Sequence, residues 1–202
     1  MIPFGFDAMQ PLYPLIVQQC MDDYGLEEGV AVEVGAGPGH LSVEFAKATS
    51  MELILVDIDG AALGKARERI EAAKADNIVS YLQADAEQLP LREESADFVI
   101  SRGSIGFWKH PVSGLKECLR ILKPGGTALV GVGAGRYLPP TLRRRIYSAM
   151  AADAKGKPDR PQRYTPEEYE TFAQAAGLRN YRVISEGSDN KGTWLEFRKP
   201  GS

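Results

Sequence analysis

The sequence predicts an α/β domain with a mostly parallel sheet, helices on both faces and an antiparallel hairpin at the carboxyl end. Short apolar runs alternate with segments of helical period along the chain, which is typical of βαβ units and their parallel sheets. Near the end, only a short polar turn separates two apolar runs, and a parallel connection would need a dozen or more residues. At 202 residues the chain fits one well-buried domain, 1–202.

Each element rests on a local pattern of apolar residues and stop signals. Residues 1–28 are expected to form an amino-terminal helical cap with a helix over 11–24, and 134–164 a basic, lid-like insertion. Thr165, Pro166 and Glu168 form the start signal of a helix that ends at Gly177. The remaining expected elements are strands at 30–34, 53–56, 78–82, 127–132, 182–185 and 193–197, a strand centred on 98–100, and helices from His40, over 60–75 and over 112–122.

The composition is that of an ordinary globular protein, with 44% hydrophobic and 25% charged residues and a formal net charge of -3. The cysteines, Cys20 and Cys118, lie far apart, which argues against a disulfide framework and a cysteine-rich zinc site. The first residues do not read as a signal peptide, and no apolar run is long enough to span a bilayer. We therefore expect a cytoplasmic protein with no metal and no membrane insertion.

The strongest motif is the glycine-rich turn that follows the first strand, Glu33 to Gly39. Glycines let the chain turn sharply and let a polar ligand approach the backbone. Dinucleotide enzymes also carry such turns, but His40 stands where their pattern has a third Gly or Ala. Asp57 ends the second strand, where a carboxylate can accept both hydroxyls of a ribose, and Asp85 follows the third strand. The turn and the two carboxylates predict a nucleoside-binding site.

Two further segments complete a family pattern: Ser95 to Ser101 and Leu122-Lys123-Pro124-Gly125-Gly126. With the turn and the two carboxylates, they make residues 30–132 resemble the class I S-adenosylmethionine-dependent methyltransferases, nearest to the ubiquinone/menaquinone methyltransferase branch. The resemblance implies a three-layer Rossmann-like sandwich with seven strands in the order 3-2-1-4-5-7-6, and S-adenosylmethionine as cofactor with S-adenosylhomocysteine as product. The cofactor-binding residues that it implies are Glu33, Gly35, Ala36, Gly37, Gly39, Asp57, Ile58, Asp85, Ala86, Ser101, Arg102 and Ser104.

The resemblance assigns parts of the cofactor to these residues. Glu33 to Gly39 would hold the methionine portion, and Asp57 the ribose. Ile58 and Ala86 would flank the adenine, whose amino group Asp85 would bind. Many family members carry Asp where this chain has Glu33, and Arg102 could meet the acceptor, the methionine carboxylate or solvent. Asp59 is interpreted as exposed or as the cap of the next helix, and His40 as a helix-start residue near the cofactor.

The acceptor side is less defined by the sequence. Trp108 either lines an acceptor pocket or packs on the following helix, and His110 either moves a proton or caps that helix ahead of Pro111. Phe4 and Phe6 either complete a lid or simply pack. No catalytic residue is assigned beyond the candidate His110.

The segment 134–163 carries eight arginines and lysines against two aspartates, a net charge of +6. It either recruits an acidic or phosphorylated acceptor, with Arg136 in the pocket and Arg143, Arg144 and Arg145 beside it, or is a solvated basic helix.

Three other functions compete with that of a small-molecule methyltransferase. An RNA- or DNA-directed methyltransferase could use the basic segment, but Ser101 to Ser104 is unlike the Asn/Asp-Pro-Pro-Tyr/Phe run of amino-directed enzymes. A nicotinamide-dependent dehydrogenase is disfavoured by His40 and by the closing hairpin. A protein that binds the cofactor without catalysis stays open. The expected partner is a small-molecule, possibly anionic, methyl acceptor, and the sequence gives no oligomeric state.

Overall fold

The computed structural model describes residues 9–153, 161–186 and 192–201 and forms a seven-stranded sheet. The strand order is β3-β2-β1-β4-β5-β7-β6, as expected. The parallel strands are β1 (Val30–Val34), β2 (Glu52–Asp57), β3 (Val79–Gln83), β4 (Ala96–Arg102) and β5 (Leu122–Val132), and the antiparallel hairpin is β6 (Tyr181–Ser185) and β7 (Thr193–Arg198).

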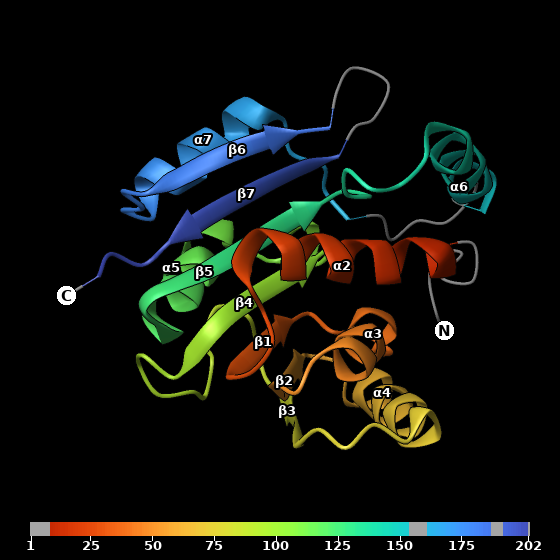
Figure 1. Cartoon of the computed structure of the whole chain (residues 1–202). Helices are drawn as coiled ribbons and strands as arrows, with labels where there is room; N and C mark the ends of the chain where they lie inside the picture. The colour runs from red at the N-terminus through yellow and green to blue at the C-terminus, as the bar shows by residue number, and fades with distance from the viewer. Residues whose placement is uncertain (1–8, 154–160, 187–191, 202) are drawn as a thin grey trace.

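Helices cover both faces of this sheet, which makes the three layers of the fold (Figure 1). One face carries α2 (Tyr13–Tyr24), α3 (His40–Ala48) and α4 (Gly60–Ala73), and the other carries α5 (Pro111–Ile121) and α7 (Pro166–Ala175). Strand side chains alternate between the two cores: Phe98 and Ile100 face α2 and α3, whereas Val99 faces α5. Short 3₁₀ turns, η1 (Gln10–Leu12) and η2 (Ile105–Phe107), precede α2 and α5.

The carboxyl-terminal part confirms the expected helix start and hairpin. The Thr165 hydroxyl accepts from the backbone N–H of Glu168, whose carboxylate accepts from the backbone N–H of Thr165, so a capping box opens α7. Helix α6 (Pro140–Asp153) lies in the segment that was interpreted as an insertion. It stands beyond the end of β5, at the edge of the molecule in Figure 1.

Strands β2, β6 and β7 are slightly longer than expected, and β3 and β5 begin at other residues than expected. Strand β3 begins one residue later than expected, and Ile78 is left 70% exposed. Strand β5 begins at Leu122 rather than Thr127 because the residue before Pro124 is driven away from helical geometry, so the chain turns extended directly after α5. The pairing register with β4 shifts between Ala96 and Phe98 to accommodate this longer strand.

Across the part of the chain that the structure describes, no helix is long and apolar enough to cross a membrane. The same part contains no group of three or more His, Cys, Asp or Glu side chains that could hold a metal ion.

Candidate active site

A cavity of about 540 Å³ opens at the carboxyl ends of β1, β2 and β4, the edge where open α/β folds bind their ligands. The segments Glu33–His40, Asp57–Asp59 and Ala84–Glu87 supply much of its wall, apart from Gly39, and the turn after β4 supplies the rest. The structure therefore brings the glycine turn and both nucleoside-type carboxylates to one cavity, as the sequence predicted.

Backbone hydrogen bonds fix the glycine turn against the end of β2. The N–H groups of Gly35 and Ala36 both donate to the Val56 carbonyl, at 2.8 and 3.0 Å. The N–H of Gly37 donates to the Asp57 carboxylate at 2.7 Å. Asp57 thus holds the turn with one oxygen, while its other oxygen accepts from the N–H of Asp59 at 2.9 Å.

At two positions of the turn only glycine fits, because the backbone has a positive φ and because a Cβ would collide with a neighbouring residue. Gly35 has φ +75°, and a Cβ there would lie 2.2 Å from the Cβ of Ser104. Gly39 has φ +74°, and its Cβ would lie 2.7 Å from the Cβ of Ala66 in α4. Gly39 does not line the cavity; it lets α3 begin directly against α4.

Glu33 is the most strongly perturbed carboxyl group of the cavity. Its side chain accepts a hydrogen bond from the Ser42 hydroxyl and is only 7% exposed. Burial raises the pKa of Glu33 to about 8, aided by the charge of Asp57 and opposed by the Ser42 hydrogen bond and the charge of Arg102. Glu33 therefore holds its proton more tightly than an exposed glutamate does.

The other nucleoside-side residues lie at the rim. Ile58 is 70% exposed, which is unusual for a large apolar side chain, and it lines the cavity together with Ala86. Asp85 is exposed and accepts from the N–H of Glu87 at 2.9 Å. Asp59 accepts from the N–H of Ala61 as the cap of α4, in agreement with its interpretation as a capping residue.

The Ser101–Ser104 segment at the end of β4 is partly buried in the interior and partly exposed to the cavity. Ser101 is fully buried, does not line the cavity and bonds the Ser104 hydroxyl at 2.5 Å. Arg102 and Ser104 do line it. The Ser104 hydroxyl donates to the Val34 carbonyl at 3.0 Å, which ties the β4 turn to the end of β1.

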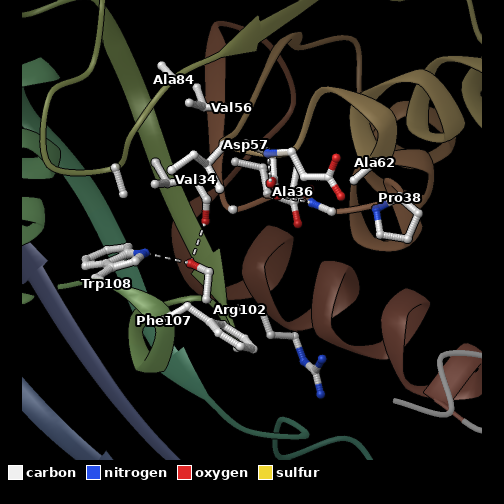
Figure 2. Close-up of a pocket in the computed structure, with 18 of the residues that line it drawn as sticks. Val34, Ala36, Pro38, Val56, Asp57, Ala62, Ala84, Arg102, Phe107 and Trp108 are labelled. Carbon is white, nitrogen blue, oxygen red and sulfur yellow. Dashed lines mark hydrogen bonds between the residues drawn. The ribbon is translucent and has the colours of Figure 1, made fainter. Parts of the chain in front are cut away.

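Trp108 fits both interpretations that the sequence left open. Its indole N–H donates to the Ser104 hydroxyl at 3.2 Å and its ring lines the cavity, while the same ring packs on α5 at Gly114. Phe107 is 56% exposed beside it. In Figure 2 these two rings lie across the pocket from Asp57 and Pro38.

His110 is exposed and does not line the cavity. Its backbone N–H donates to the Glu87 carboxylate at 2.6 Å, and its side chain makes no capping hydrogen bond at the start of α5. The structure does not bring this candidate base to the cavity.

The basic segment 134–163 contributes less to the cavity than its net charge of +6 suggested. Arg136 pairs with both carboxylate oxygens of Asp23 in α2 and does not line the cavity. Arg143 donates to the Gly135 carbonyl at 2.7 Å, so it holds the chain ahead of α6, while Arg144 and Arg145 are exposed. The aromatic candidates Phe4 and Phe6 lie outside the described residues.

Sequence reasoning missed several lining residues, chiefly Tyr13, Lys65, Glu87 and Lys109. His40, interpreted as a helix-start residue, is the first residue of α3, and its ring stacks on Tyr13 with centroids 5.5 Å apart. The apolar spacing of α2 gave no sign that Tyr13 reaches the end of β4, because that approach depends on how α2 crosses the sheet.

Comparison with known proteins agrees with this geometry. Residues 32–130 match a family described as a methyltransferase domain. The chain is 39% identical over 98 residues to 2-methyl-6-phytyl-1,4-hydroquinone methyltransferase 2 of Oryza sativa, covering 48% of this chain and 27% of that protein. It is 30% identical over 133 residues to the ubiquinone/menaquinone biosynthesis C-methyltransferase UbiE of Idiomarina loihiensis, covering 62% and 53%. The chain thus spans about half, or less, of these curated relatives.

Solved structures of methyltransferases superpose on nearly the whole chain. A Methanococcus maripaludis protein described as an S-adenosyl-L-methionine-dependent methyltransferase superposes with a TM-score of 0.84 at 25% identity, covering 96% of this chain and 88% of that one. A phosphoethanolamine N-methyltransferase of Haemonchus contortus, solved with S-adenosylhomocysteine, shares the fold with a TM-score of 0.67 at 18% identity, covering 92% and 53%.

The chain carries a methyltransferase domain over residues 32–130, and its strand order and the cavity at the carboxyl ends of the strands are those of the class I S-adenosylmethionine-dependent methyltransferases. Within that class it resembles the ubiquinone/menaquinone C-methyltransferases and the phytyl-hydroquinone methyltransferases.

Proposed function

We propose that the chain transfers the methyl group of S-adenosylmethionine to a ring carbon of a small quinol-type acceptor. The observation that carries the proposal is the aromatic wall of Phe107 and Trp108, which lines the same cavity as the glycine turn. Aromatic side chains favour stacked or edge-on contact with a flat ring. The names of the curated relatives, which include hydroquinone and quinone C-methyltransferases, support the same acceptor class.

The cavity, at about 540 Å³, has the size of a small-molecule or cofactor site, which supports cofactor binding there. We propose that Glu33 and Gly35–Gly37 hold its methionine portion and that Asp57 accepts the ribose hydroxyls. Ile58 and Ala86 would flank the adenine, which accounts for an apolar side chain left 70% exposed at position 58, and Asp85 would bind the adenine amino group. The cofactor supplies a methyl group already activated on a sulfonium.

The chain's own contribution is orientation and exclusion of water. Ser104 holds the Trp108 indole and the end of β1 in one hydrogen-bonded unit, so the aromatic wall is fixed relative to the glycine turn. Positioning of this kind supplies about 7–11 kcal/mol in well-oriented reactions. This role requires no general base from the protein, in keeping with an exposed His110.

We further propose that an acidic group on the acceptor, where present, pairs with Lys109. Lys109 lines the cavity next to the aromatic wall, whereas Arg136 and Arg143 are engaged by Asp23 and the Gly135 carbonyl. Lys109→Ala should raise KM for an acidic acceptor and leave KM for its neutral analogue unchanged. The matched control is Lys116→Ala, which removes an exposed lysine of α5 that does not line the cavity.

The acceptor class is tested with methyl-labelled S-adenosylmethionine. Purified protein is offered substituted hydroquinones, their carboxylated analogues and total RNA in parallel, and the products are identified by mass spectrometry. We expect label on a ring carbon of a hydroquinone. Label in RNA alone would favour the nucleic-acid-directed alternative, and no transfer to any acceptor despite cofactor binding would favour a non-catalytic binding protein.

A further inference from the structure

The carboxylate of Glu87 lies at the start of helix α5, although Glu87 belongs to the loop after β3. Glu87 lines the cavity, and its Oε1 atom accepts a hydrogen bond from the backbone N–H of His110 at 2.6 Å. His110 is the residue that precedes α5, and its own side chain makes no capping hydrogen bond there. The first turn of α5, residues 111–114, carries no acidic side chain. An anion is stabilised at a helix amino terminus, so Glu87 caps α5 from a different segment of the chain.

The same loop carries the residue proposed to bind the adenine amino group, Asp85. The Asp85 carboxylate accepts from the backbone N–H of Glu87 at 2.9 Å, and its carbonyl accepts from the backbone N–H of Gln88 at 3.1 Å. These two bonds close a tight turn over residues 85–88. A ligand that fixes Asp85 therefore also restricts Glu87.

Helix α5 also holds the far end of this loop. The backbone N–H of Leu89 donates to the Glu117 carboxylate at 2.8 Å. The Arg120 guanidinium donates to the carbonyls of Leu89 and Leu91, at 3.0 and 2.8 Å, and pairs with Glu117 at 2.7 Å. The loop is thus fastened along α5, with Glu87 at the start of the helix.

The start of α5 is also where the aromatic wall is attached. Trp108 and Lys109 immediately precede His110, and both line the cavity. The Trp108 ring packs on Gly114, whose backbone N–H donates to the His110 carbonyl at 3.3 Å. A displacement of His110 would therefore move Trp108 and Lys109 relative to the cavity.

We propose that Glu87 is a positioning residue that couples the nucleoside half of the cavity to the acceptor half. A bound adenine restricts the turn over residues 85–88, and the hydrogen bond from His110 to Glu87 transmits this restriction to the start of α5. The aromatic wall is then held more firmly when the cofactor is present. The inference rests on the proposed function and adds a reason for the acceptor to bind more tightly to the cofactor-bound protein. Because such coupling is reciprocal, a bound acceptor tightens nucleoside binding by the same factor.

Adenosine tests this coupling without an acceptor, because it carries only the nucleoside portion of the cofactor. Hydrogen exchange of the backbone amides of residues 107–114 is measured with and without saturating adenosine. Adenosine should slow this exchange about fivefold or more in the unaltered protein, the lower end of the usual range for coupling between two sites. S-adenosylhomocysteine, which contains the same nucleoside, should slow it at least as much. Glu87→Ala should abolish the slowing, whereas Glu87→Gln should keep most of it because the amide oxygen can accept the same hydrogen bond.

The matched control is Glu93→Ala. Glu93 belongs to the same connection between β3 and β4, lies 3.8 Å from the Lys199 ammonium and does not line the cavity. This variant should keep the full slowing by adenosine. The amides of β6 and β7, which do not line the cavity, should exchange at the same rate in every variant. That comparison separates a loss of coupling from a loss of global stability.

Equal slowing in the unaltered protein and in Glu87→Ala would overturn the proposal. So would calorimetric binding of adenosine or S-adenosylhomocysteine without slower exchange at residues 107–114, a result that would leave the cofactor site itself standing. If the unaltered protein bound neither ligand, the proposed cofactor site would be wrong, and the coupling with it.

Discussion

The indole N–H of Trp108 donates to the hydroxyl of Ser104, 3.2 Å away, and that hydroxyl in turn donates to the Val34 carbonyl. Figure 2 shows this chain of hydrogen bonds running from the aromatic wall to the end of β1. A single hydroxyl thereby sets the aromatic wall relative to the glycine turn. The orientation of the acceptor should depend on it.

Ser104→Ala should therefore raise acceptor KM and lower kcat while cofactor affinity changes little. The variant leaves the buried indole N–H without a partner, which costs about 1–3 kcal/mol of stability. Trp108→Phe keeps an aromatic ring and lacks the N–H. Steady-state kinetics of both variants and of the double variant test the coupling, and strictly additive effects would contradict it.

The absence of a side chain at Gly114 determines where the Trp108 ring can lie. A Cβ at position 114 would stand 2.5 Å from an indole carbon. Gly114→Ala should displace the ring, cost about 1–3 kcal/mol through overpacking, and raise acceptor KM with S-adenosylhomocysteine affinity unchanged. The control is Gly64→Ala in α4, where no atom lies within 4 Å of the added Cβ. That change should stabilise the protein by up to about 1 kcal/mol, and equal stability of the two variants would argue against the contact.

The raised pKa of Glu33 should make the stability of the protein fall as the pH rises. Its pKa is raised from 4.5 to about 8 in the folded protein, so between these values the folded state keeps a proton that the unfolded state releases. The free energy of unfolding of ligand-free protein should fall as pH rises through this window, by up to about 1.4 kcal/mol per pH unit from this group. Glu33→Gln should remove that contribution and at the same time weaken S-adenosylhomocysteine binding.

Denaturant titrations at about pH 5 and about pH 8 measure this contribution as a difference between variants. Glu68→Gln, an exposed substitution on α4, controls for the change of net charge. If the unfolding free energies of the unaltered protein and of Glu33→Gln fell by the same amount between the two pH values, the raised pKa of Glu33 would be refuted.

His110→Ala should leave turnover essentially unchanged, because His110 is exposed and does not line the cavity. Its effect on stability should be about 0.5 kcal/mol or less, as for other surface substitutions. The measurement is kcat with the acceptor identified by the labelling screen. A loss of about a hundredfold or more, the size typical of a removed general base, would restore His110 as a catalytic group.

Local patterns were enough to predict the elements that local chemistry determines. The capping residues Thr165 and Asp59, the glycine turn and the closing hairpin all follow from short-range rules, and the structure has them where the sequence placed them. The strand order followed from the family resemblance. The start of β5 was missed because the influence of Pro124 on the preceding residues was given too little weight.

The remaining site residues depend on contacts between segments far apart in sequence. Arg136 pairs with Asp23, 113 positions away, and a charge count cannot identify such a partner. Tyr13 meets Arg102 only because α2 crosses the sheet in front of β4 (Figure 1). Ser101 and Ser104 share one short segment, yet Ser101 lies buried within β4, whereas Ser104 lies in the turn after β4 and lines the cavity.

The most direct test is calorimetric titration of the purified protein with S-adenosylhomocysteine, with NAD titrated in parallel and Asp57→Ala as the variant. Asp57 fixes the turn through the N–H of Gly37 and stands where a ribose is expected. We predict one-to-one binding of S-adenosylhomocysteine, no binding of NAD, and loss of binding in Asp57→Ala. Binding of NAD without binding of S-adenosylhomocysteine would contradict the cofactor assignment and every proposal that rests on it.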